Sequence, residues 1–221
     1  MAIKALFPTL VYRAPLRGNL SRVFDQNLAD ECQSLALSDV AGQRWSEKHY
    51  LGGYTSYGSL DRLHLVSSLF DKLRRAIDPH VLRFARALHY DLSGRQLVMT
   101  DCWLNVMPAG VVHSLHLHPS SFISGTYYVV VPKGAGFLKF EDPRLASLMA
   151  APPRRVDAPK AVRAFVDLPA QAGDVVLFES WLRHEVPPAR YQGERVSISF
   201  NYAWLPASAK AGEKRKSDAR R

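Results

Sequence analysis

The sequence contains little cysteine and no long hydrophobic run. Two cysteines, Cys32 and Cys102, occur among 221 residues, far apart and without a C-x-x-C spacing. They predict neither a disulfide framework nor a thiolate zinc site. No apolar stretch approaches the roughly 18–20 residues of a membrane span, which excludes a membrane-spanning role. Residues 1–15 lack the basic start, apolar block and cleavage site of a secretory signal, so we expect a cytoplasmic protein.

Acidic residues are also few. Asp and Glu number 20 against 29 Lys and Arg, which gives a net charge of +9. Residues 208–221 hold six basic side chains against two acidic ones and carry +4 of that charge. We therefore expect a disordered basic tail over 206–221 and a single domain over 1–205. The charge does not by itself indicate a nucleic-acid partner, although a nucleic-acid-binding tail is the alternative.

Helical and strand patterns occupy different parts of the chain. Apolar residues at intervals of three to four predict helices over 21–37, with Ser21 as the N-cap, and over 61–90, with a kink or division at Pro79. From about residue 100, short runs of β-branched and aromatic residues predict strands. The predicted strands are 101–107, 124–131, 136–141, 161–167, 174–179 and 195–204. This order predicts an α+β fold, a sandwich or barrel over about 100–205 with helical support over about 20–90.

Two segments carry more specific expectations. The last predicted strand alternates, with Val196, Ile198, Phe200 and Tyr202 on one side and Ser197, Ser199 and Asn201 on the other. The stretch 143–160 contains four prolines and has no periodicity. Long loops of this kind are often lids, so we expect it to be a mobile loop beside the functional site.

Histidines are the strongest chemical signal. Three of the eight occur within 113–118, and His116 with His118 forms an H-x-H at the approach to a strand. Strand residues at i and i+2 point to the same side, so two imidazoles there can bind one metal ion. His184 follows the predicted strand 174–179, which could run beside the first, and would add a third imidazole. The alternative is a set of hydrogen-bonded polar residues at a strand edge.

The motif order then identifies a family. It runs H-x-H, S-G-T-Y-Y-V-V-V-P, G-F-L-K-F-E-D-P-R, G-D-V-V-L-F-E-S-W-L-R-H-E-V and R-V-S-I-S-F-N. This order resembles the double-stranded β-helix core of the 2-oxoglutarate and Fe(II)-dependent oxygenases, especially bacterial and phage members with an H-x-H-P element. The resemblance covers about 103–201. It implies a jelly-roll, cupin-like core with the N-terminal helices packed on one sheet.

The resemblance also implies roles for residues. His116 and His184 correspond to the two iron-binding histidines, while His118 stands where most members have a carboxylate. A three-histidine site is favoured; a two-histidine site with water, or another residue such as Glu141 or Asp142, remains open. Arg195 would bind the distal carboxylate of 2-oxoglutarate. The further candidates for binding this co-substrate are Ser197, Asn105 and Tyr128.

The implied activity is that of an Fe(II)- and 2-oxoglutarate-dependent dioxygenase that uses O2, hydroxylates an unactivated C–H bond and releases succinate and CO2. Two alternatives stay open: a three-histidine iron dioxygenase that does not use 2-oxoglutarate, and a β-barrel binding module with a nucleic-acid-binding tail. The partner is expected to be a small-molecule or peptide substrate, with no membrane. The resemblance allows a homodimer and does not identify the substrate.

Overall fold

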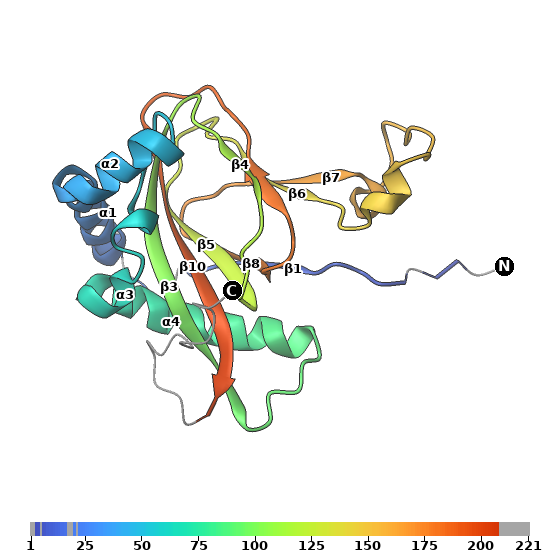
Figure 1. The fold of residues 1–221 in the computed structure, drawn as a ribbon, viewed down its shortest axis with the longest axis horizontal. Helices are drawn as coiled ribbons and strands as arrows, with labels where there is room; N and C mark the ends of the chain where they lie inside the picture. The colour runs from blue at the N-terminus through green and yellow to red at the C-terminus, as the bar shows by residue number, and fades with distance from the viewer. Residues whose placement is uncertain (1–2, 5, 17–19, 21, 208–221) are drawn as a thin grey trace, which may run out of the picture.

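A computed structural model describes residues 3–4, 6–16, 20 and 22–207. Four helices lie together on one side of a six-stranded antiparallel sheet, and a four-stranded antiparallel sheet lies beyond it (Figure 1). Residues 208–221 of the predicted tail, and the predicted N-cap Ser21, fall outside the described residues. No helix in the described ranges combines the length and apolarity needed to cross a membrane.

The helices form because apolar residues recur on one face. The helices are α1 (Arg22–Ser38), α2 (Val40–His49), α3 (Leu63–Val66) and α4 (Ser68–Ala87). Of the predicted kink or division at Pro79, the division is wrong, because α4 runs continuously through the proline. The break in this segment lies at Ser67, between α3 and α4. Ile77 and Val81 are buried on both sides of the proline, and their packing outweighs one lost backbone hydrogen bond. Helix α2 has no counterpart among the predicted helices.

The large sheet has the order β1-β8-β5-β10-β3-β2. Its strands are β1 (Val11–Pro15), β8 (Asp174–Glu179), β5 (Ile123–Val130), β10 (Glu194–Pro206), β3 (Arg95–Pro108) and β2 (Tyr54–Thr55). The small sheet has the order β4-β9-β6-β7. Its strands are β4 (His113–His116), β9 (His184–Val186), β6 (Phe137–Glu141) and β7 (Phe165–Pro169). Strands β1, β2, β4 and β9 were not predicted, because each is short and pairs with partners distant in sequence.

Two apolar cores separate the layers. One lies between the helices and the large sheet and includes Val196, Ile198, Phe200 and Tyr202 of β10, which confirms the predicted alternation. The other lies between the two sheets and joins side chains of β5 and β8 to side chains of β6 and β9. The opposite face of β10 therefore points toward the space between the sheets.

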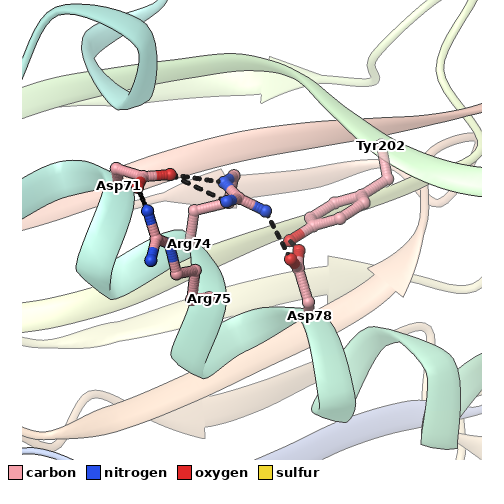
Figure 2. A network of polar contacts seen from close by, with 5 residues as sticks. All are labelled: Asp71, Arg74, Arg75, Asp78 and Tyr202. Atoms are coloured by element: carbon pink, nitrogen blue, oxygen red, sulfur yellow. Dashed lines mark hydrogen bonds and ion pairs between the residues drawn. The ribbon is translucent and has the colours of Figure 1, made fainter. Parts of the chain in front are cut away.

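A polar network ties α4 to β10. The Tyr202 hydroxyl donates to Asp78 Oδ1 at 2.7 Å, and Arg74 Nη1 donates to Asp78 Oδ2 at 2.6 Å (Figure 2). Arg74 also donates two hydrogen bonds to Asp71, and Arg75 donates another to that carboxylate. The network holds the supporting helix against the strand that carries Arg195.

The segment 143–160 lies at the end of the hairpin of β6 and β7, which extends away from the helices (Figure 1). It contains the short 3-10 helix Leu145–Leu148. A second 3-10 helix, Lys160–Val162, occupies the start of the predicted strand 161–167, so β7 begins only at Phe165. None of its residues lines either cavity at the histidines. The expectation of a loop beside the site is therefore wrong, because β6 and β7 carry the segment outward from the small sheet.

Candidate metal centre and co-substrate site

Polar side chains lie at the centre of the large sheet's inner face. The register pairs Ser197 of β10 with Asn105 of β3 on one side and with Tyr128 of β5 on the other. Directly paired residues of an antiparallel sheet point to the same face, so the three side chains share the face away from the helices. Tyr127 packs in the helix-side core, where its hydroxyl donates to Asp25 at 3.0 Å.

Three histidines meet where β4 and β9 pair. His116 ends β4, His184 begins β9, and the two are directly paired. His118 lies two residues beyond β4, and its backbone N–H donates to the Ser180 carbonyl at 2.9 Å. Its Nε2 lies 3.3 Å from Nε2 of His184, and one ligand nitrogen from each ring lies within 4.8 Å of the others. The predicted strand 174–179, now β8, does run beside β5, the strand that the H-x-H approaches. His184 lies beyond β8 on the separate strand β9, which brings it beside His116.

Backbone carbonyls determine the tautomers of two of these rings. Nδ1 of His116 lies 2.7 Å from the carbonyl oxygen of Ser114, and Nδ1 of His184 lies 2.9 Å from that of Leu182. A carbonyl oxygen only accepts, so each Nδ1 carries the proton and each Nε2 keeps its lone pair. Metal-binding histidines are commonly held in this way through their other nitrogen. Both rings are therefore set to offer Nε2 to a cation.

Burial keeps the cluster uncharged. It lowers the pKa of His118 to about 2 and the pKa of His184 to about 3, and repulsion from neighbouring histidines adds to the effect. Burial also lowers the pKa of His116. The imidazoles are neutral near pH 7, which is the form that binds a metal ion.

The nearby carboxylates are engaged elsewhere. Asp142 accepts from the backbone N–H of Arg144 at 3.0 Å and from its guanidinium at 2.9 and 2.8 Å, so its carboxylate is used within this turn. Glu141 forms an ion pair with Arg183 at 2.8 Å. Among the described residues, no Asp or Glu lines the cavity that contains the histidines.

Arg195 is a buried cation without an acidic partner in this cavity. It lies near the start of β10 and is 2% exposed. Its guanidinium lies 5.0 Å from the centre of the Tyr128 ring. Within the described part of the chain, its Nε and Nη1 have no hydrogen-bond partner. An uncompensated buried charge costs several kcal/mol, so the arrangement calls for an anion.

The arginine and the histidines face the same cavity. Its lining includes His116, His118, His184 and Arg195 together with Asn105 and Ser197. The hydroxyls of Tyr50 and Tyr128 are also buried without a partner among the described residues. Three imidazoles at one end, with a guanidinium and unpaired hydroxyls nearby, fit a divalent metal ion and an anion with several oxygens.

Comparison with known families decides between the classes of protein. Residues 101–201 match the family model described as "Putative 2OG-Fe(II) oxygenase", which covers every strand from β4 to β9 and most of β3 and β10. This chain is similar to that family over its strand-rich half, residues 101–201. The match indicates an oxidoreductase, and Fe(II) and 2-oxoglutarate, for which the family is named, are the cofactor and co-substrate expected from the sequence resemblance.

Solved structures share this fold. A prolyl-4-hydroxylase from Pseudomonas putida aligns with a TM-score of 0.52 and 18% identity over 88% of this chain and 92% of its own. The epimerase SnoN from nogalamycin biosynthesis aligns with a TM-score of 0.60 and 16% identity, over 94% and 89%. HygX from Streptomyces hygroscopicus aligns with a TM-score of 0.58 and 15% identity, over 91% and 84%. A comparison with curated protein sequences finds no significant match.

The cavity also contains His113. It lies three residues before His116, one residue out of phase with it on a strand, which predicts a place behind the metal ligands or in solvent. Its ring stacks on His116, with centroids 4.2 Å apart, and it lines the same cavity without joining the cluster of three. The pairing of β4 with β9 shifts register between these residues, and this β-bulge restores the phase.

Other lining residues come from the N-terminal part of the chain. Tyr50 and His49 come from the end of α2, and Tyr57 comes from the 3-10 turn Ser56–Gly58. In the sequence, His49 has no partner at a metal-binding spacing. These side chains reach the site through the position of α2 beside β2 and β3, which local periodicity does not contain.

Proposed function

We propose that the protein is an Fe(II)- and 2-oxoglutarate-dependent dioxygenase in which His116, His118 and His184 hold the iron and Arg195 binds the distal carboxylate of the co-substrate. One observation carries the proposal. A fully buried guanidinium with unpaired nitrogens faces the same cavity as three neutral imidazoles. A dicarboxylate that reaches both groups would compensate the buried charge.

The chain's own residues would bind the metal ion and orient the co-substrate. The carbonyls of Ser114 and Leu182 hold two imidazoles with Nε2 toward the cluster. Ser197 and Tyr128 lie beside Arg195 on the paired strands and would donate to carboxylate oxygens. Asn105, whose Nδ2 donates to Ser199 at 3.0 Å, completes this polar row. With O2, the bound iron and 2-oxoglutarate would supply oxidation of a substrate C–H to C–OH, with release of succinate and CO2.

The absence of a carboxylate from the cavity lining favours three histidines as the ligand set. Three neutral imidazoles leave an Fe(II) ion with its full double charge. The dianion of 2-oxoglutarate neutralises that charge, and Arg195 adds one positive charge at the far end of the cavity. Such a site attracts an anionic co-substrate more strongly than one with a carboxylate ligand does.

Hydroxylation is the proposed outcome, since a prolyl-4-hydroxylase shares the fold. SnoN, which shares it as well, is an epimerase, so the fold alone does not select the reaction. An iron dioxygenase that ignores 2-oxoglutarate would have no use for the buried guanidinium. The single domain over 1–205, the cytoplasmic location, the small-molecule or peptide substrate and the homodimer stay predictions.

An anaerobic titration of the metal-free protein with Fe(II) and 2-oxoglutarate tests the proposal. We expect the visible charge-transfer band of a bidentate 2-oxo acid on iron. His118→Ala should abolish or shift the band, and Arg195→Met should require much more 2-oxoglutarate. Arg183→Met, which removes an arginine paired with Glu141 outside the cavity lining, is the control. Iron binding without a band would favour the dioxygenase that ignores 2-oxoglutarate; no iron binding would refute the assignment of the histidines.

A further inference from the structure

A second, larger cavity opens onto the histidine cluster. It has a volume of about 320 Å³, and His116 and His118 contribute to the lining of both cavities. Cavities of about this size hold one small molecule or one side chain with its flanking groups. Its position beside the proposed iron ligands makes it the place where a substrate would present a C–H bond.

One wall of this cavity is a continuous row of rings. Trp103 lies beside His118 with centroids 5.8 Å apart, Tyr57 contacts Trp103 edge-on at 5.2 Å, and Trp45 follows Tyr57 at 6.1 Å. His49 continues the row at 4.5 Å from Trp45. The row runs from a proposed metal ligand to the mouth. Ring edges and faces of this kind favour aromatic partners in offset or edge-to-face contact.

The mouth exposes apolar surface. Tyr57, Val112 and Leu117 are 51%, 43% and 41% exposed, and all three line the cavity. An apolar occupant would cover them and so remove this surface from water, which favours binding. The polar groups of the lining, such as Thr55, Ser114 and Asn201, carry no charge and can orient a substrate through a few hydrogen bonds.

The charge of the lining further limits the kind of substrate that this cavity can bind. Among the described residues, no Lys, Arg, Asp or Glu lines this cavity. An anionic ring would find no cationic side chain along the wall. A cationic ring would find no carboxylate, and it would approach a centre where Fe(II), Arg195 and 2-oxoglutarate together carry one positive charge. An uncharged ring meets neither penalty.

We propose that the primary substrate presents an uncharged aromatic or heteroaromatic ring, which the row Trp45–Tyr57–Trp103 positions beside the histidine cluster. This inference rests on the proposed function for the statement that the occupant is a substrate. The cavity and its selectivity are properties of the chain alone, so they can be measured without turnover.

Fluorine NMR with four matched probes tests the inference: 4-fluorobenzyl alcohol, 4-fluorobenzoate, 4-fluorobenzylammonium and (4-fluorocyclohexyl)methanol. Line widths would be measured with the full chain, metal-free and loaded with Zn(II) and 2-oxoglutarate. We expect the alcohol to bind most tightly in both forms. In the loaded form the ammonium probe should bind at least about tenfold more weakly. The cyclohexyl probe should bind about three- to tenfold more weakly, the range for loss of one aromatic contact.

Variants assign the binding to the row of rings. Tyr57 is half exposed, so the Tyr57→Ala and Tyr57→Leu variants should fold normally. Both should bind 4-fluorobenzyl alcohol about three- to tenfold more weakly. Trp181→Ala removes a ring of similar exposure that lies outside this cavity and should change nothing. Equal binding of the cyclohexyl probe, tighter binding of either ion, no binding of the alcohol, or an unaffected Tyr57→Ala would each overturn the inference. The probes could bind as expected to a protein that shows no charge-transfer band with Fe(II) and 2-oxoglutarate. That result would refute the proposed function but would still support the aromatic binding site.

Discussion

Replacing Arg195 with methionine should move folding stability and co-substrate binding in different directions. Methionine has a similar length and no charge, so it can fill the volume of the arginine stem. The substitution removes a cation that is 2% exposed and has two unpaired nitrogens, which relieves a desolvation cost. It also removes the contact with the Tyr128 ring, worth about 0.5–2 kcal/mol. We expect the free energy of unfolding to stay level or rise by up to about 3 kcal/mol.

Binding of 2-oxoglutarate should weaken sharply in the same variant. Loss of one partner from a buried, hydrogen-bonded charge pair costs about 2–5 kcal/mol, or roughly 30-fold to several thousand-fold in Kd. Urea unfolding of the metal-free protein gives the first quantity, and calorimetric titration of 2-oxoglutarate into the Ni(II)-loaded protein gives the second. Arg183→Met should leave the Kd unchanged. An unchanged Kd in Arg195→Met, or a loss of several kcal/mol in stability, would refute the reasoning, because either result means that a protein group already partners the guanidinium.

Three further results are expected. Tyr202→Phe should lower the free energy of unfolding by about 1–3 kcal/mol in urea, because it removes the hydrogen bond that the buried Tyr202 donates to the partly exposed carboxylate of Asp78; a change near zero would contradict this role of the network. Lowering the pH from 7 to 5 should destabilise the metal-free protein, because the unfolded histidines gain protons below their ordinary pKa of 6.5 while His118, with a pKa of about 2, does not. The loss should approach 1.4 kcal/mol per pH unit for each such histidine, and His118→Asn should reduce the slope; an unchanged slope in that variant would contradict the reasoning. Gly125→Ala should cost about 1–3 kcal/mol by thermal unfolding, because its Cβ would lie 2.5 Å from a backbone oxygen of the adjacent strand; wild-type stability would show that the strands can separate at no cost.

The parts of the fold that follow local periodicity could be predicted from the sequence. The alternation of β10 placed Ile198 and Phe200 in the helix-side core and Ser197 on the opposite face, because a strand has a period of two whatever its partners are. The sequence predicted a helical segment over 61–90, and the structure has α3 and α4 there, interrupted at Ser67 and not at Pro79. Packing of α4 against the sheet, which is a tertiary effect, decided what happens at Pro79.

The candidate site likewise contains residues that local sequence patterns predict and residues that only tertiary contacts bring in. His116, His118 and His184 were found from spacing and motif order, and Asn105 and Tyr128 from their strands. The sequence did not choose between a place behind the ligands and a place in solvent for His113, because the bulge in the pairing of β4 with β9 depends on both strands. Tyr50 and Tyr57 reach the cavity because α2 lies against β2 and the 3-10 turn lies against β3, which are contacts that local periodicity does not contain.

The geometry of β10 suggests why the two halves of the site would differ in rigidity. One face of this strand is buried in the helix-side core, and the other carries Arg195 and Ser197, so the co-substrate groups stand on a strand paired along both edges. His184 stands on a three-residue strand, and His118 lies beyond the end of β4. An anion bound at Arg195 would thus meet preorganised donors, whereas a metal ion would order the histidines as it binds. Amide exchange should accordingly slow on metal addition at β4 and β9 and change little along β10.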